Sequence, residues 1–333
     1  MRAFDFIDAR SAQEAAELLT TYGKRAQLFA AGADVLFMLK DAIEGPMEPS
    51  PEVLINLGKV KELEGIGHDP TAGLLLGAMT RLIAIIEHPV IEAQYSLLAQ
   101  AASQVASPQL RHTSTIAGNL CQRPRCWYFR NRDIVCLKKG GSMCWAVEGD
   151  NRYYHAILVL EGGPCYIVHP SDMAPALIAL DAQIHILGPN GARSLPLEEF
   201  FVSPVQRLYQ ENVLERGEVI TALTVPPVSA ETKQVFLKSR VRQADEISLA
   251  AVALAAQVKG GTCLDCRVVL GGVSPRPHRA IAAEEVIKGK PLTEDNIQQV
   301  AAAALADARP MGMNAYKLDL TRGLVVRAFQ QVA

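Results

Sequence analysis

The segment CQRPRCWYFRNRDIVCLKKGGSMC, at positions 121–144, places the strongest constraint on how this chain folds. It holds four of the seven cysteines and six Lys and Arg residues, with hardly any run of aliphatic residues. It shows neither the period of a helix nor the alternation of a strand, so it offers no apolar face to a core. We therefore predict an inserted loop whose fold depends on what its cysteines bind.

The composition excludes several classes of protein. A length of 333 residues favours two or three domains. With 33 basic and 35 acidic residues, the chain lacks the excess of positive charge that a nucleic-acid surface needs. Its longest apolar runs are shorter than the roughly 20 residues of a transmembrane helix. The N-terminus does not resemble a secretory signal, so we expect a cytoplasmic location, with periplasmic co-export on a partner's twin-arginine signal as the alternative.

The cysteines point to metal ligation or to buried thiols. Their number is odd and the chain is long, which argues against a disulfide framework. From Cys126 to Cys144 the spacing is C-x9-C-x7-C, without the paired knuckles of structural zinc. A 4Fe-4S cluster accepts four thiolates at irregular spacing. From the residues alone, an iron-sulfur cluster, a zinc site and no metal all remain open.

The regions around this segment carry helix and strand patterns. Ser11 is a good N-cap and Gly23 a good stop for the first helix, and Pro89 divides a later helical region into two helices. The expected elements are a helix at 11–23, strands within 25–37 and at 53–58, strands at 63–69 and 73–79, helices within 81–107, a polar loop at 108–120, strands at 155–160 and 165–169, a helix at 173–182 and a strand at 183–189.

A change in composition near position 228 indicates a domain boundary. The pattern after it predicts an antiparallel three-stranded sheet backed by helices. Cys263 and Cys266 form a C-x-x-C, but residues i and i+3 of a strand point to opposite faces, so we expect two structural thiols. The expected elements are strands at 234–242, 247–260 and 263–274 and helices at 280–287, 293–308 and 315–332.

Two turns of small residues let the main chain approach a ligand closely. They are FAAGADVLF at 29–37 and TSTIAGNL at 113–120. Exposed N–H groups in such turns suit a pyrophosphate, although ordinary turns have the same composition. The fingerprints of Rossmann dinucleotide sites, P-loops, zinc proteases and serine hydrolases are absent.

Together these stretches resemble the FAD-binding medium subunit of the molybdenum hydroxylases, the xanthine dehydrogenase and carbon monoxide dehydrogenase family. The resemblance covers essentially the whole chain. It implies an α+β fold, with a FAD-binding domain of the vanillyl-alcohol-oxidase (PCMH) type and a C-terminal domain like that of the carbon monoxide dehydrogenase flavoprotein. The similar stretches are AAGADVL at 30–36, TIAGNL at 115–120, PSDMAPAL at 170–177, FLKSRVRQADEISLAAVALA at 236–255 and NAYKLDLTRGLVVRAF at 314–329.

The resemblance implies three regions: residues 1–57 and 58–228 bind FAD, and residues 229–333 form the C-terminal domain. The insertion spans about 121–165 of the second region. Ala33 stands where the family more often has a second glycine, so its methyl group requires a negative φ. The implied FAD contacts are Ala30, Ala31, Gly32, Ala33, Asp34, Val35, Thr113, Ser114, Thr115, Ile116, Ala117, Gly118, Asn119, Asp172 and Lys238.

A smaller group within the family carries a 4Fe-4S cluster in an insertion after the second FAD loop. It comprises the flavin subunits of 4-hydroxybenzoyl-CoA reductase and of bacterial three-subunit aldehyde oxidoreductases. The segment here looks like theirs, especially in RCWYFRN and NRYYHAIL. This resemblance implies that Cys126, Cys136, Cys144 and Cys165 bind the cluster, and it leaves Cys121 as a packed free thiol.

The resemblance also implies a heterotrimer. A large subunit would hold molybdopterin and substrate, and a small subunit with two 2Fe-2S clusters would pass electrons to the flavin of this chain and on to an external carrier. A stand-alone flavoprotein and a zinc-stabilised scaffold remain as alternatives. The basic residues of the insertion could form a solvated loop face, stabilise an anionic cluster or dock an acidic electron carrier. They are Arg123, Arg125, Arg130, Arg132, Lys138 and Lys139.

Overall fold

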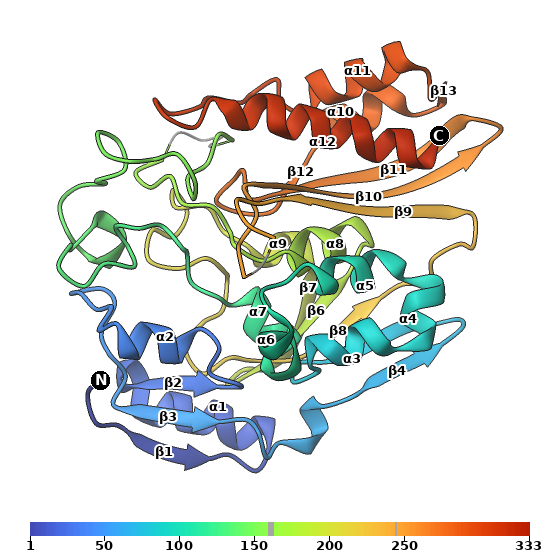
Figure 1. Cartoon of the computed structure of the whole chain (residues 1–333). Coiled ribbons are helices and arrows are strands. Elements are labelled where there is room, and N and C mark those ends of the chain that lie inside the picture. The colour runs from blue at the N-terminus through green and yellow to red at the C-terminus, as the bar shows by residue number, and fades with distance from the viewer. Residues whose placement is uncertain (159–162, 244) are drawn as a thin grey trace.

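The computed structural model describes residues 1–158, 163–243 and 245–333 and arranges them around three sheets (Figure 1). The first sheet is parallel, in the order β1-β3-β2. Helix α1 (Ala12–Tyr22) begins and ends as predicted, because Glu14 N donates to Ser11 Oγ and Gly23 stops the helix with a φ of +58°. The strands of this sheet are β1 (Asp5–Asp8), β2 (Ala26–Phe29) and β3 (Val53–Asn56). A 3-10 turn, η1 (Gly23–Arg25), follows α1.

The second sheet is antiparallel, in the order β4-β5-β8-β6-β7. Strand β6 alternates in burial along its length, and its inward side chains Ile184 and Ile186 join Leu223 of β8 in the main core. Side chains from the first sheet and from α1 belong to the same core. The strands of this sheet are β4 (Ile66–Asp69), β5 (Gly73–Gly77), β6 (Gln183–Gly188), β7 (Gly191–Pro196) and β8 (Val219–Val225).

Short helices surround this sheet. The prediction of a polar loop at 108–120 is wrong, because two short helices form there. The first has six residues and is capped by Ser107, and the second has five and is capped by Thr115. Helices this short do not show a helical period in the sequence. Pro89 starts a helix as predicted, but a further break at Tyr95 makes three helices where two were expected. The elements are η2 (Lys61–Leu63), α3 (Leu82–Glu87), α4 (Pro89–Gln94), α5 (Ser96–Ser103), α6 (Pro108–Thr113), α7 (Ile116–Leu120), α8 (Met173–Ala179) and α9 (Leu197–Phe200).

The C-terminal domain is a sheet with three long antiparallel strands, as predicted. Helices α10 and α12 pack on this sheet, which also contacts α5 and α8 of the preceding region. No helix within the described residues is both long and apolar enough to cross a bilayer. The elements are β9 (Thr232–Ser239), β10 (Ala250–Lys259), β11 (Thr262–Gly271), β12 (His278–Arg279), β13 (Lys290–Pro291), α10 (Ile281–Ile287), α11 (Glu294–Ala303) and α12 (Tyr316–Val332).

Cys263 and Cys266 lie on the same face of β11, contrary to the prediction. The register shifts between Gln257 and Val258 of β10, so that β11 contains one extra residue. Leu264 is exposed, and the alternation restarts after this bulge. Both thiols are therefore buried in the C-terminal core, within hydrogen-bonding contact of each other.

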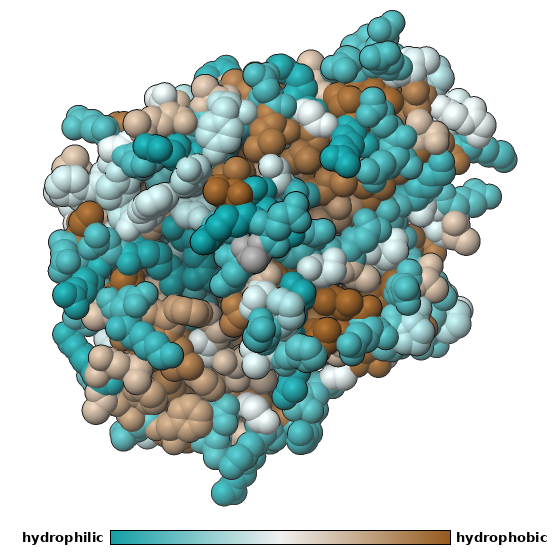
Figure 2. Space-filling model, in the orientation of Figure 1, coloured by the Kyte–Doolittle hydropathy of each residue, from teal (hydrophilic) through white to brown (hydrophobic). Residues whose placement is uncertain are grey.

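The described part of the insertion, which spans about 121–165, contains almost no regular structure. It holds one 3-10 turn, η3 (Leu137–Lys139). The strands expected at 155–160 and 165–169 are wrong where the structure describes them: they reduce to one bridge between His155 and Ile167, and residues 159 and 160 lie outside the described part. The insertion lies between the N-terminal sheet and the C-terminal domain, and its face in Figure 2 is mainly hydrophilic.

Candidate functional site

The first small-residue turn connects β2 to α2 (Val35–Lys40) and requires glycine at one position. Gly32 has a φ of +71°, and a Cβ there would lie 2.6 Å from Phe29 Cε2 and 2.8 Å from Leu36 Cδ1. Ala33 has no positive φ, so its methyl group meets the condition set by the sequence. The backbone N–H groups of Gly32, Ala33 and Asp34 have no acceptor among the described residues. This turn therefore offers free donors to an anionic ligand.

The second small-residue turn, at 113–120, spans the end of α6 and the whole of α7, and several of its amides are already hydrogen-bonded. Ala117 N donates to Ala78 O at 3.1 Å. Gly118 N donates to Thr115 Oγ1 at 3.2 Å, and Asn119 N donates to Thr115 O at 2.9 Å. The expectation of exposed N–H donors is wrong for these positions, because the turn folds into a capped helix. The small residues of the second turn allow a ligand to approach closely, but the amides of Ala117, Gly118 and Asn119 already donate to acceptors within the protein.

Both turns open onto one pocket with a volume of about 520 Å³, which is within the usual range for cofactor sites. Its wall also includes Cys121 and Arg125 from the insertion. Three of the implied FAD contacts do not line it: Thr113 is exposed, Ile116 is buried in the main core, and Lys238 lies behind the wall. The implied contacts that do line it are Ala30, Ala31, Gly32, Ala33, Asp34, Val35, Ser114, Thr115, Ala117, Gly118, Asn119 and Asp172.

Asp172 and Lys238 form a buried ion pair beside the pocket. Lys238 Nζ lies 2.6 Å from Asp172 Oδ2 and also donates to Gln104 O at 2.9 Å. Ser248 Oγ donates to the other carboxylate oxygen of Asp172 at 2.5 Å. Asp172 thus faces the pocket in a defined orientation, and Lys238 positions it.

The carboxylate of Asp34 joins the first turn to the insertion. It accepts hydrogen bonds from Arg125 at 2.6 Å, from Arg130 at 2.7 Å and from the backbone N–H of Arg123 at 2.7 Å. Burial alone would raise the pKa of Asp34, but the guanidinium groups of Arg125 and Arg130 hold it below its ordinary value. Asp34 therefore stays ionised and ties the cysteine segment to the pocket.

The four cysteines predicted as cluster ligands lie together. Cys126, Cys136 and Cys165 share one buried apolar cluster, and the half-buried Cys144 interacts electrostatically with Cys136 and Cys165. Burial raises the pKa of Cys126 and of Cys165 to about 12, so the free thiols are neutral. The other buried side chains of the cluster are Met38, Ile43, Phe129 and Ile167.

Backbone N–H groups donate to these sulfur atoms. Such donors stabilise a thiolate more than a thiol, and in iron-sulfur proteins hydrogen bonds to sulfur tune the reduction potential. His155 Nε2 also lies 3.3 Å from Cys126 Sγ. The backbone donors are Tyr128 and Phe129 for Cys126, Ala146, Val147 and Tyr166 for Cys144, and Ile167 for Cys165.

The arrangement of these thiols does not suit a single ion. Among the described residues, no group of three or more His, Cys, Asp or Glu side chains is placed to hold one metal ion. A structural zinc site draws its four ligands around one atom. A 4Fe-4S cluster binds each thiolate at a separate iron atom, so its ligands stand farther apart. The four cysteines are compatible with such a polynuclear core.

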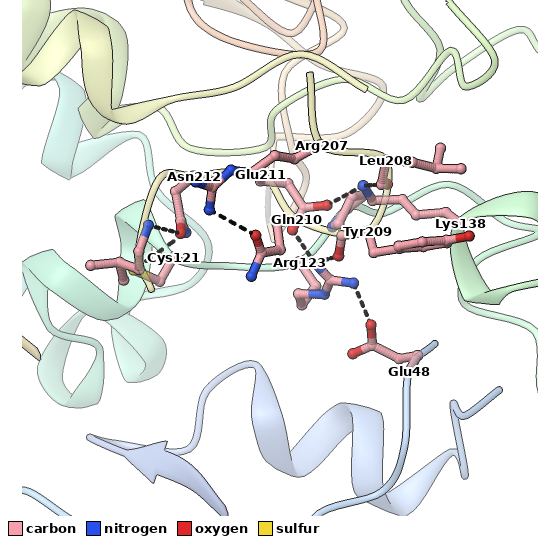
Figure 3. A network of polar contacts seen from close by, with 12 residues as sticks. Glu48, Cys121, Arg123, Lys138, Arg207, Leu208, Tyr209, Gln210, Glu211 and Asn212 are labelled. Carbon is pink, nitrogen blue, oxygen red and sulfur yellow. Dashed lines mark hydrogen bonds and ion pairs between the residues drawn. The ribbon is translucent and has the colours of Figure 1, made fainter. Parts of the chain in front are cut away.

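Arg123 connects three segments of the chain (Figure 3). Its guanidinium group forms ion pairs with Glu48 and Glu211 and donates to Tyr209 O at 3.1 Å. Lys138 Nζ lies 2.6 Å from Glu211 Oε1. Burial alone would raise the pKa of Glu211, but Arg123 and Lys138 hold it below its ordinary value. The ionised Glu211 therefore anchors the insertion from inside.

The basic residues of the insertion do not form a solvated face. Arg132 is the exposed one of the six, and the other five turn inward to hydrogen bonds or ion pairs. Lys139 is fully buried: Nζ donates to Asn131 O at 2.6 Å and has no ion pair with a carboxylate among the described residues. Burial lowers the pKa of Lys139, and ionisation of Cys136 would oppose that shift. This buried amine lies near the thiols without a direct ion pair, although Glu48 and Asp133 act on it electrostatically from farther away.

Cys121 stands apart from the other cysteines of the segment. It is a half-buried free thiol in the wall of the pocket, and Asn212 Nδ2 lies 3.9 Å from its sulfur atom (Figure 3). Burial raises its pKa to about 12.

Several residues that hold the site together could not be identified from the sequence. Glu48 and Glu211 bind Arg123, and at the other end of the insertion Asn314 and Lys317 donate to His155 O. Their partners lie far away in the chain, so no local pattern marks them. The tail stretch that begins at Asn314 resembles the family in sequence, but that similarity does not reveal its role in anchoring the insertion.

Comparisons with known proteins agree with this architecture. Residues 2–228 match the family described as FAD binding domain in molybdopterin dehydrogenase, and residues 235–332 match the CO dehydrogenase flavoprotein C-terminal domain. The chain is 33% identical over 324 residues to the aldehyde oxidoreductase FAD-binding subunit PaoB of Escherichia coli (strain K12), covering 97% of this chain and 96% of that protein.

Two further similarities involve a second organism. The chain is 28% identical over 330 residues to the carbon monoxide dehydrogenase medium chain of Hydrogenophaga pseudoflava, covering 98% of this chain and 95% of that one. A solved structure of carbon monoxide dehydrogenase from Hydrogenophaga pseudoflava superimposes with a TM-score of 0.77 at 28% identity, covering 99% of this chain and 96% of that chain.

Proposed function

Because this chain belongs to the FAD-binding medium subunits of the molybdenum hydroxylases, we propose that it carries both FAD and a 4Fe-4S cluster in a heterotrimeric aldehyde-oxidising enzyme. In this proposal it passes electrons between a small 2Fe-2S subunit and an external acceptor, while a large molybdopterin subunit binds the substrate. The observation that carries the proposal is the shared wall of the two sites: Asp34 lines the pocket and holds the insertion that bears the cysteines.

We assign FAD to the pocket between the two small-residue turns. The free N–H groups of Gly32, Ala33 and Asp34 would hold the pyrophosphate, and the close packing around Gly32 brings the main chain near it. Asp172, oriented by Lys238, would supply a polar contact at the opposite wall. When bound, FAD supplies one-electron and two-electron transfer. Here the residues of the chain bind and orient the cofactor.

We assign the cluster to Cys126, Cys136, Cys144 and Cys165. Three features support it: the four thiols converge, backbone N–H groups donate to three of the sulfur atoms, and Lys139 is buried with no direct carboxylate ion pair among the described residues. An all-thiolate cluster is anionic and would provide a counter-charge close to this amine. Cluster assembly would release the thiol protons, since the ligands bind as thiolates.

The aldehyde substrate and the three-part division are the finer parts of the proposal. The first rests on the similarity to the aldehyde oxidoreductase subunit PaoB. For the second, we propose an N-terminal FAD-binding region 1–57, a second one at 58–228 that includes the insertion, and a C-terminal domain 229–333. The two family matches meet between residues 228 and 235.

The purified full-length chain tests both cofactors together. We expect the absorption bands of a flavin, a broad iron-sulfur shoulder, and an EPR signal that appears on reduction. Metal analysis should give iron and acid-labile sulfide and no stoichiometric zinc. A colourless, zinc-containing protein would overturn the proposal and favour a scaffold, whereas flavin without iron would leave the family assignment and remove the cluster.

A further inference from the structure

A second cavity adjoins the flavin pocket, and we propose that it binds a planar aromatic anion that serves as the external electron acceptor. This inference rests on the proposed function, since it names the class of acceptor. The cavity is an open groove of about 820 Å³ between the insertion, α2 and the loop after β9. Its lining residues include Trp127, Arg132, Tyr153 and Tyr154 of the insertion and Lys40 and Arg242 from outside it.

Three aromatic rings form one side of the groove. The ring of Trp127 stacks on Tyr153 with centroids 5.9 Å apart, and its centroid lies 6.0 Å from that of Tyr154. Trp127 nevertheless remains 45% exposed, so a large part of its surface packs against nothing in the described chain. An exposed aromatic cluster of this kind offers a stacking surface to a planar ligand.

The charge of the groove favours an anion. Lys40, Arg125, Arg130, Arg132 and Arg242 line it, against the two carboxylates of Asp41 and Glu246, although the chain as a whole has a net charge of -2. The Arg132 side chain is 69% exposed and has only a loose ion pair with Asp133, at 3.5 Å. Lys40 has no ion pair among the described residues. These two cations are available to a sulfonate, carboxylate or phosphate group.

The groove and the flavin pocket share part of their walls. Arg125, Tyr154, Arg242 and Glu246 line both cavities. Tyr154 OH donates to Glu246 Oε2 at 2.9 Å, and Arg242 Nε donates to Glu246 Oε1 at 2.7 Å, so a polar partition separates them. A ligand stacked on Trp127 would lie next to the pocket assigned to FAD.

A small ligand fits this surface better than an acidic protein. Five of the six basic residues of the insertion point inward and are held by internal partners, which leaves Arg132 as the exposed one. Protein docking through charge needs a broad field of exposed residues, and the insertion does not present one. The acceptor class to which we commit is a planar quinone that bears an anionic group. Such a quinone would take up two electrons and two protons to become a hydroquinone, and a reduced flavin bound in the adjoining pocket would supply both.

Tryptophan fluorescence of the full-length chain tests the binding directly, independently of turnover. The probe is anthraquinone monosulfonate, with uncharged hydroxymethyl anthraquinone as its matched partner. Trp127 and Trp145 are both 45% exposed, but Trp145 does not line the groove. We expect saturable quenching in Trp145→Phe and its loss in Trp127→Phe. Quenching that is equal in the two variants would overturn the proposal.

The charge requirement gives a second measurement. The double variant Lys40→Gln/Arg132→Gln should bind the sulfonated probe about tenfold more weakly and leave the uncharged probe unchanged. The proposal would be overturned if both probes bound equally more weakly to this variant. It would also be overturned if an acidic electron-carrier protein quenched Trp127 and the sulfonated probe did not. FAD and iron contents are measured on the same samples, so that loss of either cofactor is recognised as failure of the proposed function and not of the groove.

Discussion

The pocket assigned to FAD and the cysteine insertion touch each other but are built in opposite ways. The pocket is formed by backbone turns at the ends of strands and short helices, where glycine and alanine set the shape. The described part of the insertion has one 3-10 turn and is held by side-chain ion pairs to Asp34, Glu48 and Glu211. A site formed by backbone turns has its shape before the ligand binds. The fold of a site formed by buried charges and thiols depends on the groups that those charges and thiols bind.

The largest expected effect is the loss of the cluster when one of its assigned ligands is replaced. Cys165→Ser should abolish the iron-sulfur EPR signal and the associated absorption, because Cys165 is buried among the other thiols and no other cysteine of the described chain lies with them. Since the pocket is built separately, FAD should remain bound. Metal analysis and the flavin absorbance of one sample measure both.

Cys121→Ser is the matched control, because this thiol lies in the same segment but lines the flavin pocket. It should keep full iron content. A full-strength cluster signal in Cys165→Ser would show that the fourth ligand is wrong, and loss of the signal in Cys121→Ser would place that thiol in the cluster instead.

The second effect is on stability. Glu211→Gln removes the carboxylate partner of the buried Lys138 and one of the two carboxylate partners of Arg123 (Figure 3). Breaking a buried ion pair by neutralising one partner costs about 3–5 kcal/mol. We therefore expect a clear fall in the melting temperature and faster proteolysis within the insertion, measured by calorimetry and by limited digestion.

An exposed ion pair provides the comparison for this effect. Glu44 lies 2.7 Å from Arg2, whose side chain is 73% exposed. Glu44→Gln should cost less than about 1 kcal/mol. If the two variants melted alike, the insertion would not depend on its buried charges.

The third effect concerns the backbone-built site. Gly32→Val places a branched side chain at a φ of +71° and against Phe29 and Leu36. Strain of this kind costs about 1–3 kcal/mol, so we expect FAD to bind about 10-fold to 100-fold more weakly. Equilibrium dialysis with FAD measures the affinity. Gly312→Ala, where no atom lies within 4 Å of the new Cβ, should leave it unchanged. Unaltered FAD affinity in Gly32→Val would remove the first turn from the flavin site.

Local patterns predicted the parts of the molecule that are built locally. The caps of α1, the three long C-terminal strands and the first small-residue turn all depend on residues within a few positions of each other. The bulge between Cys263 and Cys266 depends on the register of β10 against β11, which one strand's alternation does not reveal. The prediction of opposite faces failed for that reason.

The supports of the insertion were beyond prediction for a related reason. Asp34 and Arg125 are 91 positions apart, and Arg123 and Glu211 are 88 apart. Nothing near Arg123 or Lys138 in the sequence distinguishes a buried cation from a solvated one. The cysteines were recognised because their type limits their chemistry, whereas the charges that hold them could be assigned only from the fold.

The smallest expected effect is a pH dependence at the C-terminal anchor of the insertion. Lys317 is fully buried, and its Nζ donates to His155 O at 3.1 Å and to Gly272 O at 2.9 Å. Burial lowers its pKa from 10.5 to about 7. Above pH 7 the folded chain therefore binds fewer protons at this amine than the unfolded chain does. Stability should then rise with pH, by at most about 1.4 kcal/mol per pH unit.

The window for this measurement lies between pH 7 and about 7.5, because free thiols, with an ordinary pKa of about 8.5, begin to ionise above it. The melting temperature of the parent chain should rise across it, and Lys317→Met should flatten the rise, whatever its effect on the absolute value. The exposed Lys290→Met should keep the slope of the parent. A slope that survives in Lys317→Met would assign the dependence to another group, and the insertion would then be anchored at this end by hydrogen bonds that do not titrate.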